Sequence, residues 1–156
     1  MKIEQGVAIG DGPTLTSFNP VFRRGILAAA LVTLAGCSDA CLNSPVSHAG
    51  APGGAHSAVM FQRDCGATTG FSTQVSIVAR GEEASGSGNV FRADDDHGAA
   101  VAGKWGGPWA EIGWLAQDRL LIRYAAKSRI FDQKSEVSGI RISYQQVGAE
   151  SPQQHR

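Results

Sequence analysis

Short stretches of alternating apolar and polar residues, separated by turn-forming residues, recur through the second two-thirds of this chain. Residues 73–79 show the pattern well, with Val75 and Ile77 on one face and Gln74 and Ser76 on the other. A period of two is typical of a strand with one buried face. The predicted strands span residues 58–63, 73–79, 89–93, 111–115, 119–124 and 139–144. We therefore expect a mainly β fold, with a small antiparallel sheet arranged as a sandwich or a partly open barrel.

Turn-forming residues set the boundaries of the predicted domain. Residues 38–56 contain two prolines, three glycines and no apolar period, so we predict a flexible tether over residues 37–56, with order beginning near Ser57. The domain is predicted to span residues 57–147, and residues 148–156 to form a disordered tail. Inside the domain, Ala116-Gln117-Asp118 between two predicted strands is the strongest hairpin signal. Residues 125–131 fit either a helical turn or a loop.

An apolar run near the start of the chain has the features of an export signal. Residues 25–34 follow Arg23 and Arg24 and precede the small residues Ala35 and Gly36. As a helix, this run could span only about 15 Å, half of the roughly 30 Å hydrocarbon core, so a membrane-spanning helix is disfavoured. We expect residues 21–36 to be an N-terminal signal helix that is removed from the mature protein.

The end of this segment, Leu34-Ala35-Gly36-Cys37, resembles the lipobox of bacterial lipoproteins. The resemblance implies that diacylglycerol is attached to the sulfur of Cys37, that the chain is cut before this residue, and that the new amine is usually acylated. No cofactor is expected other than this covalent lipid. Ser38 favours delivery to the outer membrane of a Gram-negative host, with the domain facing the periplasm, and Asp39 one place later weakens that preference.

Residues 1–20 fit poorly ahead of a signal that normally begins with a short charged segment. They add two acidic groups and no apolar run, so we predict a non-native or disordered extension. A start codon at Val21, read as methionine, would give a compact precursor.

The sequence contains three cysteines. With Cys37 assigned to the lipid, Cys41 and Cys65 remain as a pair, and disulfides are common in small exported domains. The bridge would close a loop of about 25 residues and stabilise the fold by about 3.5 kcal/mol on the chain-entropy model. The alternative is a reactive thiol at Cys65, which the acidic neighbour Asp64 disfavours.

Two groups of residues are candidates for chemistry or recognition. Asp94, Asp96 and His97 carry possible metal ligands, but the spacing lacks the alternating ligands and distant glutamate of an EF-hand, so a solvated turn is the favoured interpretation. Trp105 and Trp109 lie in a glycine-rich segment. Exposed tryptophans can contact a partner protein or stack on a sugar, and packing over the sheet is the alternative.

Residues 61–76, FQRDCGATTGFSTQVS, form the most distinctive stretch of the predicted domain. Together with Gly88-Asn-Val-Phe91 and residues 114–124, they resemble a group of small uncharacterised bacterial exported proteins, over residues 57–144. The resemblance implies export and a small domain, and no activity. Members of the group begin the first strand after a turn resembling Pro-Asp-Gly-Lys, which residues 51–55 replace here.

Charge narrows the classes of function. Of fourteen basic and fourteen acidic residues, three basic and two acidic ones precede Cys37, which leaves the remainder with a net charge of about −1. An electrostatic nucleic-acid binder is therefore excluded. We expect a membrane-anchored envelope lipoprotein whose domain is a non-enzymatic module that binds an envelope protein or a glycan. The rival hypothesis is a metal- or thiol-dependent envelope hydrolase that uses residues 94–97 or Cys65.

Overall fold

The computed structural model describes residues 40–148, which form nine strands. The strands are β1 (Leu42–Gly50), β2 (His56–Asp64), β3 (Ser72–Ala79), β4 (Phe91–Asp94), β5 (Ala110–Ala116), β6 (Arg119–Ala125), β7 (Arg129–Gln133), β8 (Glu136–Val137) and β9 (Ile140–Val147). Within the described range, no helix is long and apolar enough to span a bilayer. Cys37 and the predicted segments 1–20 and 21–36 lie outside the described residues, as does the predicted tail beyond Gly148.

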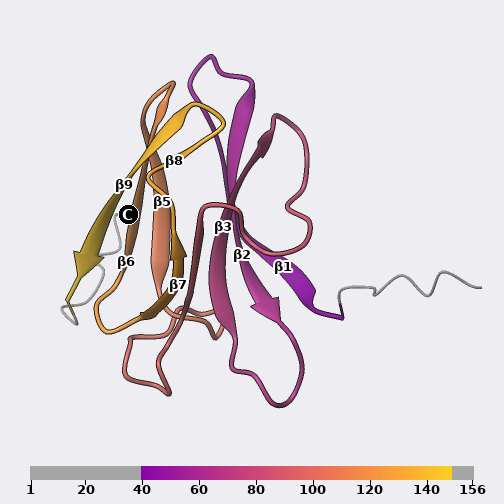
Figure 1. Ribbon diagram of the computed structural model, residues 1–156, viewed down its shortest axis with the longest axis vertical. Coiled ribbons are helices and arrows are strands. Elements are labelled where there is room, and N and C mark those ends of the chain that lie inside the picture. Colours follow the sequence, from indigo (N-terminus) through magenta and orange to yellow (C-terminus); the bar gives the residue numbers. More distant parts are fainter. Residues whose placement is uncertain (1–39, 149–156) are drawn as a thin grey trace, which may run out of the picture. The chain divides into compact units, whose positions relative to one another are not determined.

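The strands form two sheets that face each other across one core (Figure 1). The first sheet has the order β1-β2-β3-β4-β7 and is antiparallel throughout. The second has the order β5-β6-β9-β8 and is mixed. The prediction of a small mainly β domain is confirmed. The sheets do not close into a barrel, so the sandwich is the alternative that the chain adopts.

Both sheets contribute apolar side chains to the space between them. Phe91 of β4 lies near the centre with no exposed surface, and its ring centroid is 5.3 Å from that of Tyr124 and 6.0 Å from that of Tyr144. The other buried members of this core are Ala58, Met60, Val75, Ile77, Val90, Ala93, Ala110, Leu120, Ile122, Ile140 and Ile142. The alternating positions of the predicted strands thus supply the core, which is why their periodicity located six strands to within a few residues.

The first strand of the domain lies where the sequence predicted a tether. Residues 42–50 form β1, so the predicted start of order near Ser57 is wrong. β1 pairs with β2 along its length, from Leu42 opposite Asp64 to Gly50 opposite Ser57. Apart from Leu42 and Val46, its residues are mostly small or polar. It is an edge strand that carries Pro45 at a register shift, where a missing N–H is tolerated. This segment is therefore ordered by its pairing with β2, and it has no alternating apolar pattern from which a strand could be predicted.

One strand pair departs from the predicted antiparallel arrangement. β6 and β9 run parallel, with Leu120 opposite Ile142 and Tyr124 opposite Gln146. Parallel neighbours require a crossover connection. Here the chain leaves β6, joins the first sheet as β7, and returns through β8 before β9 begins. β7 and β8 are short, and β7 occupies part of the segment that the sequence left open as a helical turn or a loop.

β2 is apolar on both faces and is buried on both. Ala58 and Met60 belong to the core between the sheets, whereas Val59 and Phe61 lie on the opposite face and are only 1% and 0% exposed. Residues 80–88, which we name the cover segment, run over this outer face on the side away from the second sheet (Figure 1). A strand that is apolar on both faces needs cover on both, and the cover segment provides it on the outer one.

The predicted hairpin between β5 and β6 is confirmed. Ala116 pairs with Arg119, so Gln117 and Asp118 form the turn. Arg141 of β9 donates from Nη2 to Asp118 Oδ2 at 2.8 Å, and this hydrogen bond lowers the pKa of the Asp118 carboxyl. The turn of one hairpin is thereby joined to the start of the neighbouring strand.

Two glycines give a matched test of this packing. A Cβ on Gly107 would lie 2.6 Å from Thr73 Oγ1 and 3.0 Å from the backbone of Ser72, whereas a Cβ on Gly113 would meet nothing within 4 Å. We expect Gly107→Ala to destabilise the domain by about 1–3 kcal/mol through overpacking. Gly113→Ala should be neutral or stabilising by up to about 1 kcal/mol, because alanine loses less conformational entropy in a strand. Urea unfolding of both variants measures the difference, and equal stabilities would contradict it.

Candidate functional site at the disulfide end of the sandwich

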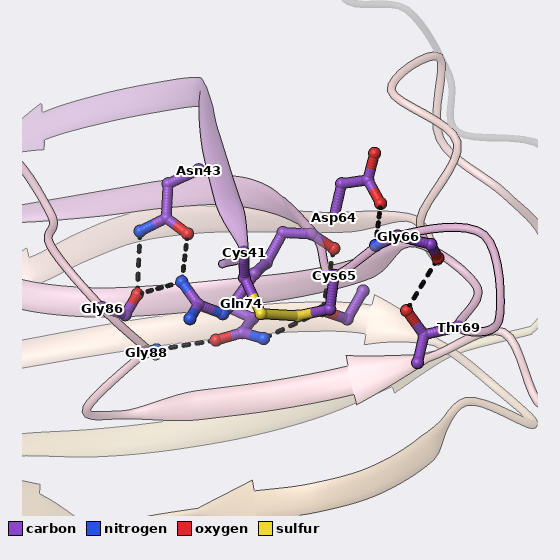
Figure 2. The surroundings of a disulfide bond; sticks show 11 residues. Cys41, Asn43, Asp64, Cys65, Gly66, Thr69, Gln74, Gly86 and Gly88 are labelled. Carbon is purple, nitrogen blue, oxygen red and sulfur yellow. Dashed lines mark hydrogen bonds between the residues drawn. A yellow bond between two sulfur atoms is a disulfide. The ribbon is translucent and has the colours of Figure 1, made fainter. Parts of the chain in front are cut away.

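Cys41 and Cys65 form a disulfide, as predicted, with their Cα atoms 4.1 Å apart (Figure 2). Cys41 directly precedes β1 and Cys65 directly follows β2, and the pairing of Leu42 with Asp64 brings the two cysteines together. The bond therefore ties the start of the edge strand to the end of its neighbour. Since Cys65 is oxidised, the alternative of a reactive thiol at this residue is wrong.

Neighbouring strand ends make up the rest of this region. β3 begins beside the end of β2, where Ser72 pairs with Arg63. Ser72 in turn pairs with Asp94 at the end of β4, and Asp94 pairs with Arg129 at the start of β7. We name this row of strand ends, with the loops 65–71 and 95–109 that follow β2 and β4, the disulfide end. The turns 51–55 and 117–118 lie at the opposite end (Figure 1).

Polar side chains hold the cover segment beside the disulfide (Figure 2). Arg63 is only 4% exposed, and its Nη1 donates to Asn43 Oδ1 at 2.6 Å and to the Gly86 carbonyl at 2.8 Å. Asn43 Nδ2 donates to the same carbonyl at 2.8 Å. Farther along, the Gly88 N–H donates to Gln74 Oε1 at 2.7 Å. A buried guanidinium and amide are tolerated because hydrogen bonds to the cover segment satisfy them.

These polar residues were missed in the sequence. Arg63 and Gln74 occupy alternating positions that the period of two assigns to an outer, solvated face. The available signal was the run Ala58-Val59-Met60-Phe61, which is apolar on both faces and so predicts a buried outer face. A polar side chain on that same face then has to find partners within the protein.

The loop after β2 is stabilised by its own hydrogen bonds (Figure 2). The Gly66 N–H donates to Asp64 Oδ1 at 2.9 Å, and the Thr69 N–H and Oγ1 both donate to the Gly66 carbonyl at 3.1 Å. Gly66 has a φ of +99°, which a side chain would strain. The loop is a compact turn whose polar groups largely bond one another.

The candidate metal ligands lie in the turn after β4. Asp94 accepts hydrogen bonds from Nε and Nη2 of Arg129, and its Oδ1 also accepts the N–H of Asp96 at 3.0 Å. The ion pair with Asp94 raises the pKa of Arg129. Asp96 and His97 both have positive φ, 48° and 60°. Across residues 40–148, no three His, Cys, Asp or Glu side chains are grouped to hold a metal ion.

A pocket of about 370 Å³ lies between the loops of the disulfide end. Its lining combines hydroxyl, carboxylate, imidazole and guanidinium groups with one apolar ring, and includes Thr68, Asp94, His97, Arg129 and Phe131. The structure thus brings the segment around Cys65 and the turn after β4 to one place, although they are about thirty positions apart in the sequence. Among the described residues, no hydrogen bond joins His97 to a hydroxyl or a carboxylate, so the pocket lacks an assembled nucleophile and base.

The two candidate tryptophans have different surroundings. Trp105 donates from Nε1 to Thr73 Oγ1 at 2.8 Å, and its ring packs so closely on Gly103 that a Cβ there would come within 2.4 Å. Trp105 therefore packs over the core. Trp109 is half-buried, and the guanidinium of Arg123 lies 5.9 Å from its ring centroid. A contact role for these tryptophans stays a prediction, and the surroundings favour Trp109 for it.

The described residues define a small disulfide-bonded β sandwich with a polar pocket at one end. No family model, curated protein or solved structure matches the chain. The likeness of residues 57–144 to small exported proteins therefore stays a prediction, and function has to be inferred from the chemistry of the chain itself.

Removing the disulfide tests its contribution to stability. We expect the double variant Cys41→Ser/Cys65→Ser to unfold with a free energy about 3.5 kcal/mol lower than the wild type, the chain-entropy value for a loop of about 25 residues. Urea unfolding measures it. Wild-type protein kept reduced should match the variant, and a difference below about 1 kcal/mol would show that β1 holds its place without the bond.

Removing the Asp94 carboxylate tests the turn after β4. In Asp94→Asn the bidentate pair with Arg129 is lost. The remaining amide oxygen is a neutral, weaker acceptor that Arg129 no longer holds in place, so we expect the backbone N–H of Asp96 to exchange its hydrogen severalfold faster. The midpoint of thermal unfolding should fall by less than about 2 °C, because exposed ion pairs contribute little to stability. Hydrogen exchange and thermal melts give both readings. Asp95→Asn is the control, and equal exchange in the two variants would contradict the role given to Asp94.

Proposed function

We propose that this protein is a bacterial envelope lipoprotein, anchored through lipid on Cys37, and that its domain is a binding module without enzymatic activity. The observation that carries the proposal is the Cys41–Cys65 disulfide. The sequence has three cysteines, so this bond leaves Cys37 as the one outside the pair, at the lipobox-like position. The arrangement supports an acceptor thiol reserved for lipid.

The anchor follows from the chemistry that the lipobox resemblance implies. A thioether-linked diacylglycerol and an acylated amine place two or three acyl chains in the bilayer. At about 0.8 kcal/mol per buried methylene, such an anchor is far more durable than a single chain. Ser38 supports a place in the outer membrane of a Gram-negative host, with the domain in the periplasm.

A binding role for the domain is supported by how its reactive groups are used. Cys65 is oxidised, and Asp94 is engaged by Arg129 and by its own turn. A thiol-dependent hydrolase therefore loses its nucleophile. For a metal-dependent one, the described residues contain no group of three His, Cys, Asp or Glu side chains placed to hold the ion. Binding another envelope component, for which we favour a protein, requires only a rigid surface with contact side chains such as Trp109.

A glycan-binding module is the second candidate, supported by the half-exposed ring of Trp109. The guanidinium beside this ring competes for the face on which a sugar would stack. A change in tryptophan fluorescence on adding envelope glycans would favour this candidate. Reproducible recovery of one protein by crosslinking the native envelope would favour protein recognition.

Lipid labelling tests the anchor. We expect the full chain, expressed in a Gram-negative host fed a clickable palmitate analogue, to incorporate label and to fractionate with membranes. The N-terminal peptide should begin at Cys37 and carry the added acyl mass. Cys37→Ser should abolish labelling and cleavage, because serine offers no thiol for the lipid. Ser38→Ala is the matched control and should label normally. An unlabelled wild type, or a labelled Cys37→Ser, would reject the proposal.

A further inference from the structure

The tether between the lipid and the folded domain is short. Cys37 precedes Cys41 by four residues, and four residues of extended chain reach at most about 15 Å. The sequence alone suggested order from Ser57, which would have allowed a tether of about 65 Å. Cys41 is itself fixed, since it is bonded to Cys65 and followed at once by β1.

This length holds the disulfide close to the membrane. The acyl chains on Cys37 would lie in the hydrocarbon core, and the headgroup layer adds about 5–7 Å on each side of that core. Part of the 15 Å reach is used in crossing that layer. The disulfide would then lie within about 10 Å of the membrane surface, less than the thickness of one sandwich domain.

Exposed apolar side chains gather at the same end. The described residues include five large hydrophobic side chains with substantial exposure, and four of them lie at or beside the disulfide end: Leu42 (71%), Phe71 (42%), Val101 (46%) and Phe131 (55%). The fifth, Leu115 (54%), lies beside the 117–118 turn at the opposite end. Phe131 is the extra residue at a register shift in β7, between Ile130 opposite Ala93 and Asp132 opposite Arg92. Bulges of this kind redirect a side chain.

The charges at this end indicate which kind of contact it can make. Lys104 and Lys127 are exposed, as is Asp96, while Asp94 and Arg129 pair with each other. No basic cluster of the kind that binds anionic lipid forms among the described residues there. Aromatic and aliphatic side chains among mixed charges suit insertion at the boundary between headgroups and acyl chains.

We infer that the disulfide end is a membrane-contact surface, which rests on the lipid bilayer with Leu42, Phe71 and Phe131 at the headgroup boundary. The inference rests on the proposed lipidation of Cys37. Lipid and apolar side chains act as two linked contacts, because the short tether keeps the side chains at high local concentration near the bilayer. The domain then presents two regions to the aqueous space. One is its opposite end, with the turns 51–55 and 117–118, and the other is the outer face of the second sheet, where Trp109 lies beside Arg123.

Hydrogen exchange on vesicles tests this orientation. Lipidated protein purified from membranes is placed in phosphatidylcholine vesicles, beside a variant with twenty glycine and serine residues inserted between Ala40 and Cys41. With the native tether, we expect the amide hydrogens of residues 65–71 and 95–101 to exchange at least about threefold more slowly than with the long tether. Amides in exposed loops exchange through frequent local opening, and contact with a surface reduces that opening. Amides of the turns 51–55 and 117–118 should not differ.

Point variants identify the contact residues. Phe71→Ser/Phe131→Ser, with the native tether, should lose most of the protection of both loops. Leu115→Ser is the matched control, since it removes an equally exposed side chain from the opposite end and should leave protection intact. Exchange in detergent solution identifies any variant whose fold has loosened, and the tether variant leaves the domain sequence unchanged.

The outcomes separate the two proposals. Mass spectrometry first establishes whether Cys37 carries lipid, and an unmodified residue would reject the proposed function. In lipidated protein, the loops could exchange at the same rate with the native tether, with the long tether and in the Phe71→Ser/Phe131→Ser variant. That result would overturn the membrane contact and leave the lipoprotein proposal standing. Protection at the turns 51–55 and 117–118 in place of the loops would also overturn it.

Discussion

The bond between Cys41 and Cys65 joins an edge strand that has no fully buried residue to a strand that is buried on both faces. β1 is mostly polar, lies at a sheet edge and contains a proline, so its own residues contribute little to its order. β2 is apolar on both faces and lies inside the same sheet. A covalent link at their junction lowers the entropy of the unfolded chain and keeps the two strands in register. With β1 and β2 held in register, Arg63 and Asn43 lie side by side on the outer face of the first sheet and both donate hydrogen bonds to the cover segment.

Strand periodicity was sufficient to locate six strands, because each of them contributes alternate side chains to the core. It failed for β1, β7 and β8, which are ordered mainly by their neighbours. Residues 42–50 contain one proline, one glycine and several small polar residues, a composition typical of a loop, and they form a strand because they pair with β2. Likewise, the parallel pairing of β6 with β9 depends on a crossover through the first sheet, which no local pattern encodes.

The candidate site was predictable in part. Counting cysteines identified the disulfide, because assigning Cys37 to the predicted lipid left two cysteines to pair. No local pattern indicates that the loop after Cys65 and the turn after Asp94 line one pocket, since that depends on β3 lying between β2 and β4. The partners of Arg63 were equally hidden, because they belong to a polar segment that resembles a solvated linker. Pairing order and long-range polar contacts are the information that local patterns lack.

The position of β9 affects how the domain can fold. It is the last strand among residues 40–148, yet it lies between β6 and β8 within the second sheet. Its Tyr144 hydroxyl can donate to the Lys134 carbonyl at 2.7 Å or the Val90 carbonyl at 3.3 Å. β9 can pair with β6 only after the chain between them has passed through β7 and β8. Closing this long loop costs conformational entropy before the strand contacts form, which slows folding. With the proposed lipid on Cys37, a chain that crosses a membrane from its N-terminus would therefore present this cysteine long before β9 emerges. Attachment to the membrane would precede the folding of the domain that it anchors.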